Sequence, residues 1–324
     1  MNVCVIGLGS MGKRRLRILK DKYPDFLIVG VDNNLKRTEY VSREYGICTY
    51  PLLMDIEAKP DCAFVCTSPQ FHGGIIEECL DRDMHVFSEI NLIDNLYKEN
   101  IEKAEKKGKT LFLSSTPLYK AEMQIIDQRV KGGNAPCVYQ YHVGQYLPDW
   151  HPWDNLKEFF VSNKITNGCR ELLAIELPWI QNTFGEIERV NVIRRKLSNL
   201  DIEFSDVYLI QIEHVGGSAG NLTVDVVSRQ AVRQLEILNE ELYIKWNGTP
   251  DSLYEKDMAS GKLEQIQAGE YIHEQGYGDF INEYAYVREI EEFFKVIKGK
   301  QPLYDFRQFF LFYFHKKAHN PPCL

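Results

Sequence analysis

Three glycines near the start of the chain are spaced for holding a phosphate. Gly7, Gly9 and Gly12 form the pattern Gly-x-Gly-x-x-Gly directly after an apolar run at residues 3–6. In this pattern the first glycine permits a tight turn, the second lets the backbone approach a diphosphate, and the third lets a helix pack against a strand. The N–H groups that open the following helix can then donate to the diphosphate. We therefore expect a dinucleotide to contact the whole turn, namely Gly7, Gly9, Ser10, Met11 and Gly12.

An acidic residue stands where the ribose of a dinucleotide would need it. Asp32 comes 20 residues after Gly12, at the end of a second apolar run. A carboxylate at this spacing accepts hydrogen bonds from ribose hydroxyls and repels a 2′-phosphate, which predicts NAD rather than NADP. Lys36 and Arg37 nearby leave NADP open as the less favoured cofactor. We expect Asn33 and Arg37 to contact the cofactor beside Asp32.

Three basic residues, Lys13, Arg14 and Arg15, follow the last glycine. Positive charge in the first turn of a helix opposes the helix dipole, and a bound anion would remove that penalty. The alternative is that all three are solvated surface residues, each tolerated at a cost of about a few tenths of a kcal/mol. The sequence leaves both interpretations open.

Two patterns of apolar residues alternate along the first 115 residues, and the strands and helices that they predict would position these groups. Short runs rich in β-formers alternate with stretches of helical spacing, which is typical of βαβ units and of a parallel sheet covered on both faces. The pattern predicts a Rossmann domain, a doubly wound parallel α/β sheet, over residues 1–118. Its strands are expected at residues 3–6, 26–31, 62–67, 85–88 and 110–114, and its helices at 13–22, 36–45, 74–82 and 97–107.

From residue 119 the pattern changes to that of an α+β domain. Six further runs are typical of strands, often joined by turn-like segments, which favours a large, mostly antiparallel sheet. We expect a second domain over residues 119–324 that serves substrate binding and oligomerisation. Its strands are expected at residues 138–146, 189–196, 208–213, 221–228, 234–238 and 241–246, and a helix at 170–184. An amphipathic helix at 284–298 is expected to pack back towards the first domain.

Composition excludes several classes of partner and site. The 324 residues carry 38 Lys+Arg against 46 Asp+Glu, and this net charge of −8 disfavours nucleic acid and membranes as partners. No apolar run approaches the roughly 20 residues of a membrane helix, and the start lacks the basic region of a signal peptide. The eight cysteines include no Cys-x-x-Cys pair, so neither a disulfide framework nor a metal site is expected. These features are typical of a cytoplasmic protein.

Two further polar segments leave predicted strands at their carboxyl ends, where a doubly wound sheet binds its ligand. One is Cys66-Thr67-Ser68-Pro69-Gln70-Phe71-His72, and the other is Ser88-Glu89-Ile90-Asn91. The alternative is that the first is only a proline turn that opens a helix, and that Glu89 is a solvated loop carboxylate.

These motifs, with a segment at residues 288–302, resemble those of the glucose–fructose oxidoreductase/inositol dehydrogenase/MocA (Gfo/Idh/MocA) family of two-domain NAD(P)-dependent oxidoreductases. The resemblance covers nearly the whole chain: residues 66–72 are similar to the family's C-T-x-P-x-x-x-H, and residues 86–92 to its V-F-x-E-K-P-L. In that family the first loop contacts the cofactor, and the glutamate lies near the nicotinamide. The resemblance implies cofactor contacts from Cys66, Thr67, Ser68, Pro69, His72, Glu89 and Asn91.

The chain departs from the family at the acid–base residues. Family dehydrogenases usually carry a lysine after this glutamate, and an aspartate and a histidine four residues apart on a helix of the second domain. Here Ile90 occupies the lysine position. Glu171 falls at the aspartate position and Ile175 at the histidine position. An alignment shifted by three residues supplies no histidine either. General-base catalysis is worth roughly 10²–10⁴-fold in rate, so either other residues act or the usual reaction is absent. The candidates for catalysis are Lys120, His151 and Glu171.

A polar and aromatic segment at residues 142–154 would suit a sugar. It holds two Trp, one Tyr, two His and two Asp, and aromatic rings stack on sugars while polar groups bond their hydroxyls. The alternative is a loop packed at a subunit interface. Arg170 is suited to an anionic group, or else to an ion pair with Glu171 or Glu176. Asp225 and Arg229 are expected to form ion pairs on the sheet surface rather than to face a cleft. The expected substrate contacts are Tyr119, His142, Trp150, Trp153 and Arg170.

With the resemblance, the sequence predicts an enzyme: an NAD-dependent oxidoreductase that transfers hydride between nicotinamide and a sugar or amino-sugar derivative. The resemblance also associates the chain with surface-glycan biosynthesis. Two alternatives stay open, namely a non-catalytic or regulatory dinucleotide-binding protein and an epimerase or lyase that uses NAD transiently. A large sheet with one open face needs cover, so we expect a homodimer or homotetramer through the C-terminal sheet.

Overall fold

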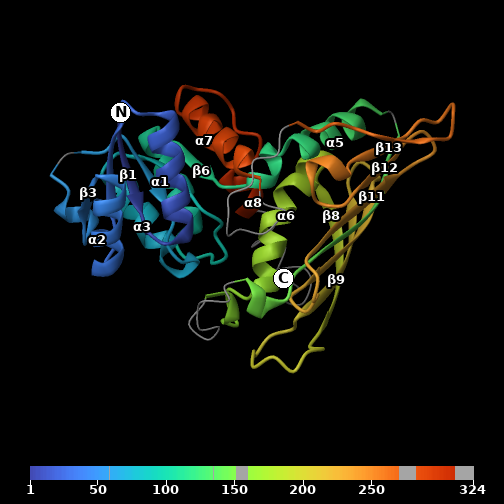
Figure 1. The fold of residues 1–324 in the computed structure, drawn as a ribbon, viewed down its shortest axis with the longest axis horizontal. Helices are drawn as coiled ribbons and strands as arrows, with labels where there is room; N and C mark the ends of the chain where they lie inside the picture. The colour runs from blue at the N-terminus through green and yellow to red at the C-terminus, as the bar shows by residue number, and fades with distance from the viewer. Residues whose placement is uncertain (58, 134, 151–159, 270–281, 311–324) are drawn as a thin grey trace. The chain divides into compact units, whose positions relative to one another are not determined.

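The structure is a computed structural model that describes residues 1–57, 59–133, 135–150, 160–269 and 282–310. The chain divides into two compact units, and the division falls between Ser114 and Ser115. The first unit also takes in the chain from Glu289 through the helix that ends at Phe310. In Figure 1 the chain begins with the blue strands of the first unit and continues through the green and yellow second unit.

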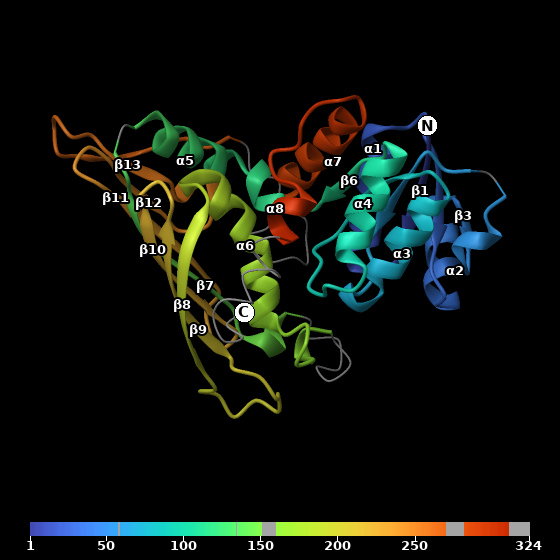
Figure 2. The same cartoon turned by 180° about the vertical axis from the view of Figure 1, so that it is seen from behind.

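The first unit is a sheet of six parallel strands in the order β3-β2-β1-β4-β5-β6. The order reverses between β1 and β4, which is the point at which doubly wound sheets bind their ligands. Helix α1 lies in front of the sheet in Figure 1, whereas α3 and α4 lie in front of it in Figure 2, so both faces are covered. The strands are β1 (Asn2–Ile6), β2 (Leu27–Val31), β3 (Cys48–Tyr50), β4 (Cys62–Val65), β5 (His85–Ser88) and β6 (Leu111–Leu113). The helices are α1 (Ser10–Lys22), α2 (Leu35–Tyr45), α3 (Pro69–Asp81), α4 (Tyr97–Lys107), α8 (Phe306–Phe310) and the 3₁₀ turn η1 (Leu53–Asp55).

Aromatic rings form much of the core of this unit. Phe64, Phe87 and Phe112, on β4, β5 and β6, stack in a row at centroid distances of 4.9 and 5.2 Å. Phe293, in helix α7 (Glu283–Ile297), packs edge-on against all three rings. Such pairs contribute about 0.5–1.5 kcal/mol each beyond their buried area. A helix from near the end of the chain is therefore fixed to the sheet built by the first third.

The second unit is built on an eight-stranded sheet in the order β14-β13-β12-β11-β7-β10-β9-β8. Its pairings are antiparallel except for β7 with β10. The strands are β7 (Val138–Gly144), β8 (Ile187–Arg195), β9 (Val207–His214), β10 (Ala219–Asp225), β11 (Val232–Leu238), β12 (Tyr243–Trp246), β13 (Tyr254–Lys256) and β14 (Leu263–Gln265). The helical elements are η2 (Thr116–Tyr119), α5 (Ala121–Gly132), η3 (Leu147–Asp149), η5 (Phe160–Ser162), α6 (Gly168–Phe184) and η6 (Pro250–Ser252).

The two faces of this sheet differ. Helices α5 and α6 cover one face in both views (Figures 1 and 2). The strand register places five exposed apolar side chains on the opposite face: Val138, Ile193, Leu209, Leu238 and Leu263. That face thus carries apolar side chains that no helix of the described chain covers.

The predicted fold class is confirmed, and the differences lie in short or weakly patterned elements. Strands β3, β13 and β14 have three residues each, so they are too short to show a period. Helix α5 was not expected. Its buried residues are Glu122, Met123 and Ile126, and a charged residue among them obscures the apolar stripe of a helix.

Candidate functional site

The first glycine turn is closed by contacts that leave no room for side chains at two positions. Gly7 has φ +89° and its N–H donates to the Val31 carbonyl at 2.8 Å. A Cβ on Gly7 would lie 2.8 Å from the Cys66 backbone, and a Cβ on Gly12 would lie 1.8 Å from the Gly7 oxygen. These two glycines are therefore required by the turn itself, as the Gly-x-Gly-x-x-Gly pattern predicts.

Gly9 is different, because no described residue forbids a side chain there. Within the described chain, the nearest atom to a Cβ on Gly9 would be Arg37 Nη1, at 4.0 Å. Gly9 is the N-cap of α1, and among the described residues no side chain caps this helix end and no acidic residue lies in its first turn. An uncapped helix N-terminus beside open space fits the diphosphate of a dinucleotide. The residues present thus fit an NAD-type cofactor.

Replacing Gly9 by valine should weaken NADH binding by at least about tenfold, since the branched side chain occupies the space over the helix N-terminus. Fluorescence titration with NADH measures the dissociation constant. The matched control is Gly74→Val, because Gly74 also lies in open space on a helix. Gly46→Val would not serve, because Gly46 has φ +62° and a valine there would strain the backbone. If Gly9→Val binds NADH as tightly as Gly74→Val does, the diphosphate is not held at this turn.

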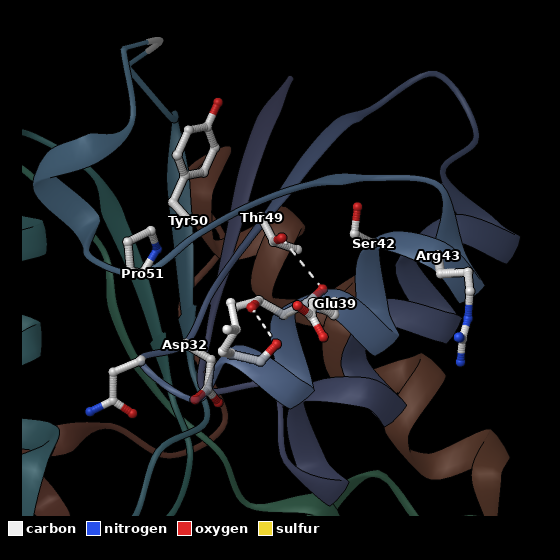
Figure 3. Close-up of a pocket in the computed structure, with 10 residues that line it drawn as sticks. Asp32, Glu39, Ser42, Arg43, Thr49, Tyr50 and Pro51 are labelled. Atoms are coloured by element: carbon white, nitrogen blue, oxygen red, sulfur yellow. Dashed lines mark hydrogen bonds between the residues drawn. The ribbon is translucent and has the colours of Figure 1, made fainter.

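Asp32 lies at the carboxyl end of β2 and is 8% exposed. Its carboxylate accepts hydrogen bonds from the Leu8 and Asn34 N–H groups, each at 2.8 Å, and Arg37 Nη1 lies 3.4 Å from Oδ2. Asp32 and Asn33 also line a cavity of about 510 Å³ between the ends of β2 and β3 and helix α2 (Figure 3). The predicted cofactor contacts Asp32, Asn33 and Arg37 are thus brought together where β2 ends.

The loop after β4 is held by a neutral histidine. His72 is 1% exposed, and its Nε2 lies 2.7 Å from the Thr67 carbonyl oxygen. Burial lowers the pKa of His72 to about 4, so at neutral pH Nε2–H donates to that carbonyl. His72 therefore shapes the predicted cofactor loop. Ser68 and Pro69 are the N-cap and first residue of α3, which agrees with a proline turn that opens a helix.

Arg15 is fully buried, and two carboxylates neutralise it inside the protein. Its Nε lies 2.7 Å from Glu89 Oε1, and its Nη2 lies 2.7 Å from Glu289 Oε2 and 3.1 Å from Ser114 Oγ. The guanidinium also lies over the Phe87 ring at 4.6 Å. The solvated-surface interpretation is therefore wrong for Arg15, and it is wrong for the buried Arg14 as well.

Glu89 is likewise no solvated loop carboxylate, because its side chain is 12% exposed and paired with Arg15. Asn91 is buried, and its Oδ1 accepts from the Ile93 N–H at 3.4 Å. Both residues leave β5 at the edge where β1, β2 and β4 also end. The sequence reasoning missed Arg15 as the partner of Glu89, and no local signal pointed to Glu289.

In the second unit Lys120 is buried among charged groups. It lies between η2 and α5 as the N-cap of α5 and is 8% exposed, with Nζ 5.6 Å above the Trp246 ring. Burial, followed by the nearby Arg233, lowers the pKa of Lys120 to about 8, against the opposing influence of Glu122 and Glu176. A lysine with this pKa can exchange a proton near neutral pH. Tyr119, a predicted substrate contact, is buried beside it at 4% exposure.

The acidic partners of this region were not predicted. Glu176 is fully buried on α6, where it pairs with Arg233 at 2.6 Å and accepts from the Tyr141 hydroxyl at 2.9 Å. The Glu176 carboxylate is therefore engaged by Arg233 and Tyr141. Glu122 is also fully buried, and burial raises its pKa.

His142 and Asp225 form a pair at the ends of the parallel strands β7 and β10. His142 Nε2 lies 2.6 Å from Asp225 Oδ2, and hydrogen bonds from His142, Val227 and Ser228 lower the pKa of Asp225 against the opposing effect of burial. Arg229 instead stacks on the Tyr146 ring at 3.9 Å. Asp225 thus pairs with His142, because the register of the parallel strands β7 and β10 brings these two residues together, whereas the expected ion pairing is not found for Arg229 among the described residues.

The start of α6 holds two other candidates. Asn167 Oδ1 caps the helix by accepting from the Arg170 N–H at 2.9 Å, and the Arg170 side chain donates to the Ile165 carbonyl. Glu171 lies in the first turn. Trp150 Nε1 donates to the Gln145 carbonyl at 3.3 Å. The candidates His151 and Trp153 lie outside the described residues.

Two features of the described residues bear on partners. No group of three or more His, Cys, Asp or Glu side chains in these residues could hold a metal ion. None of the helices that the structure describes is long and apolar enough to cross a membrane.

Comparison with known proteins gives a family and a set of similar structures. Residues 1–115 match the model of an oxidoreductase family with an NAD-binding Rossmann fold, Gfo/Idh/MocA. No curated protein matches the chain in sequence. An oxidoreductase from Agrobacterium radiobacter in complex with NAD⁺, L-tartaric acid and magnesium is 14% identical, with a TM-score of 0.82 over 95% of this chain and 92% of its own.

Two similar structures are dehydrogenases whose descriptions name a UDP-linked sugar. One is the UDP-N-acetylglucosamine 3-dehydrogenase GnnA from Acidithiobacillus ferrooxidans, 16% identical, with a TM-score of 0.74 over 95% of this chain and 93% of its own. The other is the WlbA dehydrogenase from Bordetella pertussis in complex with NADH and UDP-GlcNAcA, 14% identical, with a TM-score of 0.75 over 95% and 92%. At these identities the likeness establishes the fold. The family match over residues 1–115, the glycine turn and the two-domain fold agree that the chain resembles the Gfo/Idh/MocA family of NAD-binding oxidoreductases.

Proposed function

We propose that this protein transfers hydride between NAD and a hydroxyl-bearing carbon of a nucleotide-linked sugar or amino sugar. The observation that carries the proposal is the open space at Gly9 over an uncapped helix N-terminus, with Asp32 at the neighbouring strand end. NAD supplies the hydride acceptor. The sugar-nucleotide class is supported by the similar folds of GnnA and WlbA and by the polar, aromatic segment that begins at His142.

In this proposal the residues of the second unit handle the substrate. Lys120, whose pKa of about 8 leaves part of its population neutral at physiological pH, takes the hydroxyl proton as hydride departs. Arg170 binds an anionic group of the substrate, and His142, held by Asp225, donates to or accepts from a sugar hydroxyl. Tyr119, Trp150 and Glu171 belong to the same proposed substrate set, as do His151 and Trp153 in the segment outside the described residues.

The proposed reaction is tested by mixing the purified protein with NAD⁺ and a panel of UDP-linked sugars, with the corresponding free sugars as controls. Accumulation of NADH with a nucleotide-linked sugar but not with the free sugar supports the proposal. Conversion of the sugar without net NADH identifies an epimerase or lyase instead. NADH binding without any conversion across the panel identifies a dinucleotide-binding module and overturns the proposal.

The setting of this reaction is also a proposal. The described cysteines, Cys4, Cys48, Cys62, Cys66, Cys79, Cys137 and Cys169, are free thiols, which suits a reducing cytoplasm. The nucleotide-linked substrate class suits surface-glycan biosynthesis. We expect no nucleic acid or membrane among the partners, because the net charge is −8.

The exposed apolar residues on the open sheet face support a homodimer or homotetramer through the second unit. Light scattering on the purified protein should give a mass of two or four times the mass of one chain. A monomer at micromolar concentration would count against a subunit interface on this face.

A further inference from the structure

A buried ion pair lies close to Lys120 in the second unit. Arg233 Nη1 lies 2.6 Å from Glu176 Oε1, and the two side chains are 15% and 0% exposed. The other oxygen of this carboxylate accepts from the Tyr141 hydroxyl at 2.9 Å and from the Trp179 indole N–H at 2.6 Å. Both oxygens of Glu176 are thus engaged, and the Arg233 guanidinium is fixed in place by them.

The strand register brings this pair to the same face of the sheet as Lys120. Leu235 on β11 pairs with Tyr141 on one side and with Trp246 on the other. Arg233 lies two residues before Leu235 on the same strand, so its side chain leaves the sheet on the same face. Lys120 Nζ lies 5.6 Å from the centre of the Trp246 ring. The guanidinium and the lysine amine therefore lie over neighbouring strands of one face.

Two fixed charges oppose a positive charge on Lys120. Arg233 stays protonated at every physiological pH, as arginine does in proteins. Lys120 is also the N-cap of α5, where the helix dipole places partial positive charge. Glu122 and Glu176 act in the opposite direction, but Glu176 is engaged by the guanidinium and burial raises the pKa of Glu122. Burial, followed by Arg233, therefore lowers the pKa of Lys120 to about 8.

The other ionisable groups of this region do not reverse that balance. Burial raises the pKa of Tyr141 well above its usual value, so its hydroxyl stays neutral. Arg288 acts on Glu122, and Tyr286 acts on Arg233. Arg233 is thus the cation with the largest direct effect on this lysine among the described residues.

We infer that Arg233 is a positioning residue of the proposed reaction: held by Glu176, it keeps Lys120 ready to accept the hydroxyl proton of the substrate. This inference rests on the proposed function. As the substrate carbon loses hydride to NAD, its hydroxyl proton passes to neutral Lys120 Nζ, which becomes an ammonium. A lysine that was an ammonium beforehand could not take that proton. Arg233 exchanges no proton itself and acts only through Lys120.

The experiment follows the protonation of Lys120 by NMR in the full chain, with lysine ¹³C-labelled at Cε. The Lys120 signal is the one that Lys120→Met lacks. Arg233→Met should raise the midpoint of the Lys120 titration by at least about half a pH unit, because it removes the opposing cation. Glu176→Gln should lower the midpoint by a similar amount, because it leaves that cation without its partner. Glutamine keeps an oxygen that can accept from Tyr141 and Trp179.

Two further variants guard against an effect of folding. Arg233→Met leaves Glu176 buried without a cation, whereas the double variant Arg233→Met/Glu176→Gln restores a neutral interior. The midpoint of the double variant should lie between those of the two single variants. Arg129→Met is the control, since Arg129 on α5 forms an exposed ion pair with Glu255. It should leave the midpoint within about 0.2 pH unit of the wild type.

The outcomes separate the inference from the function beneath it. The rising limb of turnover against pH should move with the midpoint in each variant, up in Arg233→Met and down in Glu176→Gln. A structural role of the ion pair would lower turnover in both variants without moving the midpoint. Midpoints that stay in place, or that move in the same direction in both, overturn the role of Arg233. If the midpoints move in opposite directions but no sugar of the panel is converted, Arg233 controls Lys120 and the proposed function fails instead.

Discussion

Replacing Arg15 by methionine should lower the free energy of unfolding by about 3–5 kcal/mol at neutral pH. The guanidinium is fully buried between Glu89 and Glu289 and donates to each at 2.7 Å. Methionine fills a similar volume but leaves two carboxylates facing each other without a cation. Urea unfolding followed by circular dichroism measures the loss.

Two comparisons distinguish this effect from the loss of any positive charge on α1. Lys13→Met removes a cation that lies 5.3 Å from the Tyr40 ring, and should cost at most about 1 kcal/mol. In Arg15→Met the pKa of the stranded carboxyls should be raised above their unfolded values, so the folded state binds more protons. Stability of this variant should therefore recover as the pH falls towards the unfolded carboxyl pKa. A loss that is equal in both variants and independent of pH would contradict the ion-pair explanation.

The first unit was largely predictable because its signals are local. Gly7 adopts a φ of +89° and Gly12 packs on the Gly7 oxygen, so both requirements arise within one turn, and Asp32 follows a strand at a fixed distance from them. The aromatic residues of β4, β5 and β6 fall within apolar runs that the sequence displays directly. What the sequence could not supply was the partner of Arg15, because Glu289 lies 274 residues further along the chain.

The second unit was less predictable because its side chains meet through strand register. His142 and Asp225 are paired because β7 and β10 run parallel, which places Thr223 opposite His142 and Asp225 two residues beyond. Most neighbouring strands here are antiparallel, so hairpin reasoning does not give this pairing. Lys120 was predicted as a catalytic candidate from its place after the first domain. The acids around it could not be predicted, because Glu122 and Glu176 come from two different helices.

Replacing Lys120 by methionine should lower turnover by roughly 10²–10⁴-fold, which is the range for loss of a general acid or base. Methionine keeps the buried, apolar part of the side chain over Trp246. The dissociation constant of NADH should stay within about threefold of the wild type, because the nucleotide turn belongs to the other unit. Lys131→Met is the control on the same helix, since Lys131 forms an exposed ion pair with Asp127 that is worth little.

The pH profile decides whether Lys120 exchanges a proton or only supplies charge. In the oxidising direction a lysine base must be neutral, so turnover should rise with pH through the Lys120 pKa of about 8 and level off above it. Burial among Glu122, Glu176 and Arg233 sets that pKa, and arginine at the same position would keep the charge while never releasing its proton. Lys120→Arg should therefore be as inactive as Lys120→Met and should lack the rising limb. Recovery of turnover in Lys120→Arg would show that the position needs a cation rather than a base, and the proton would then have to pass to another residue.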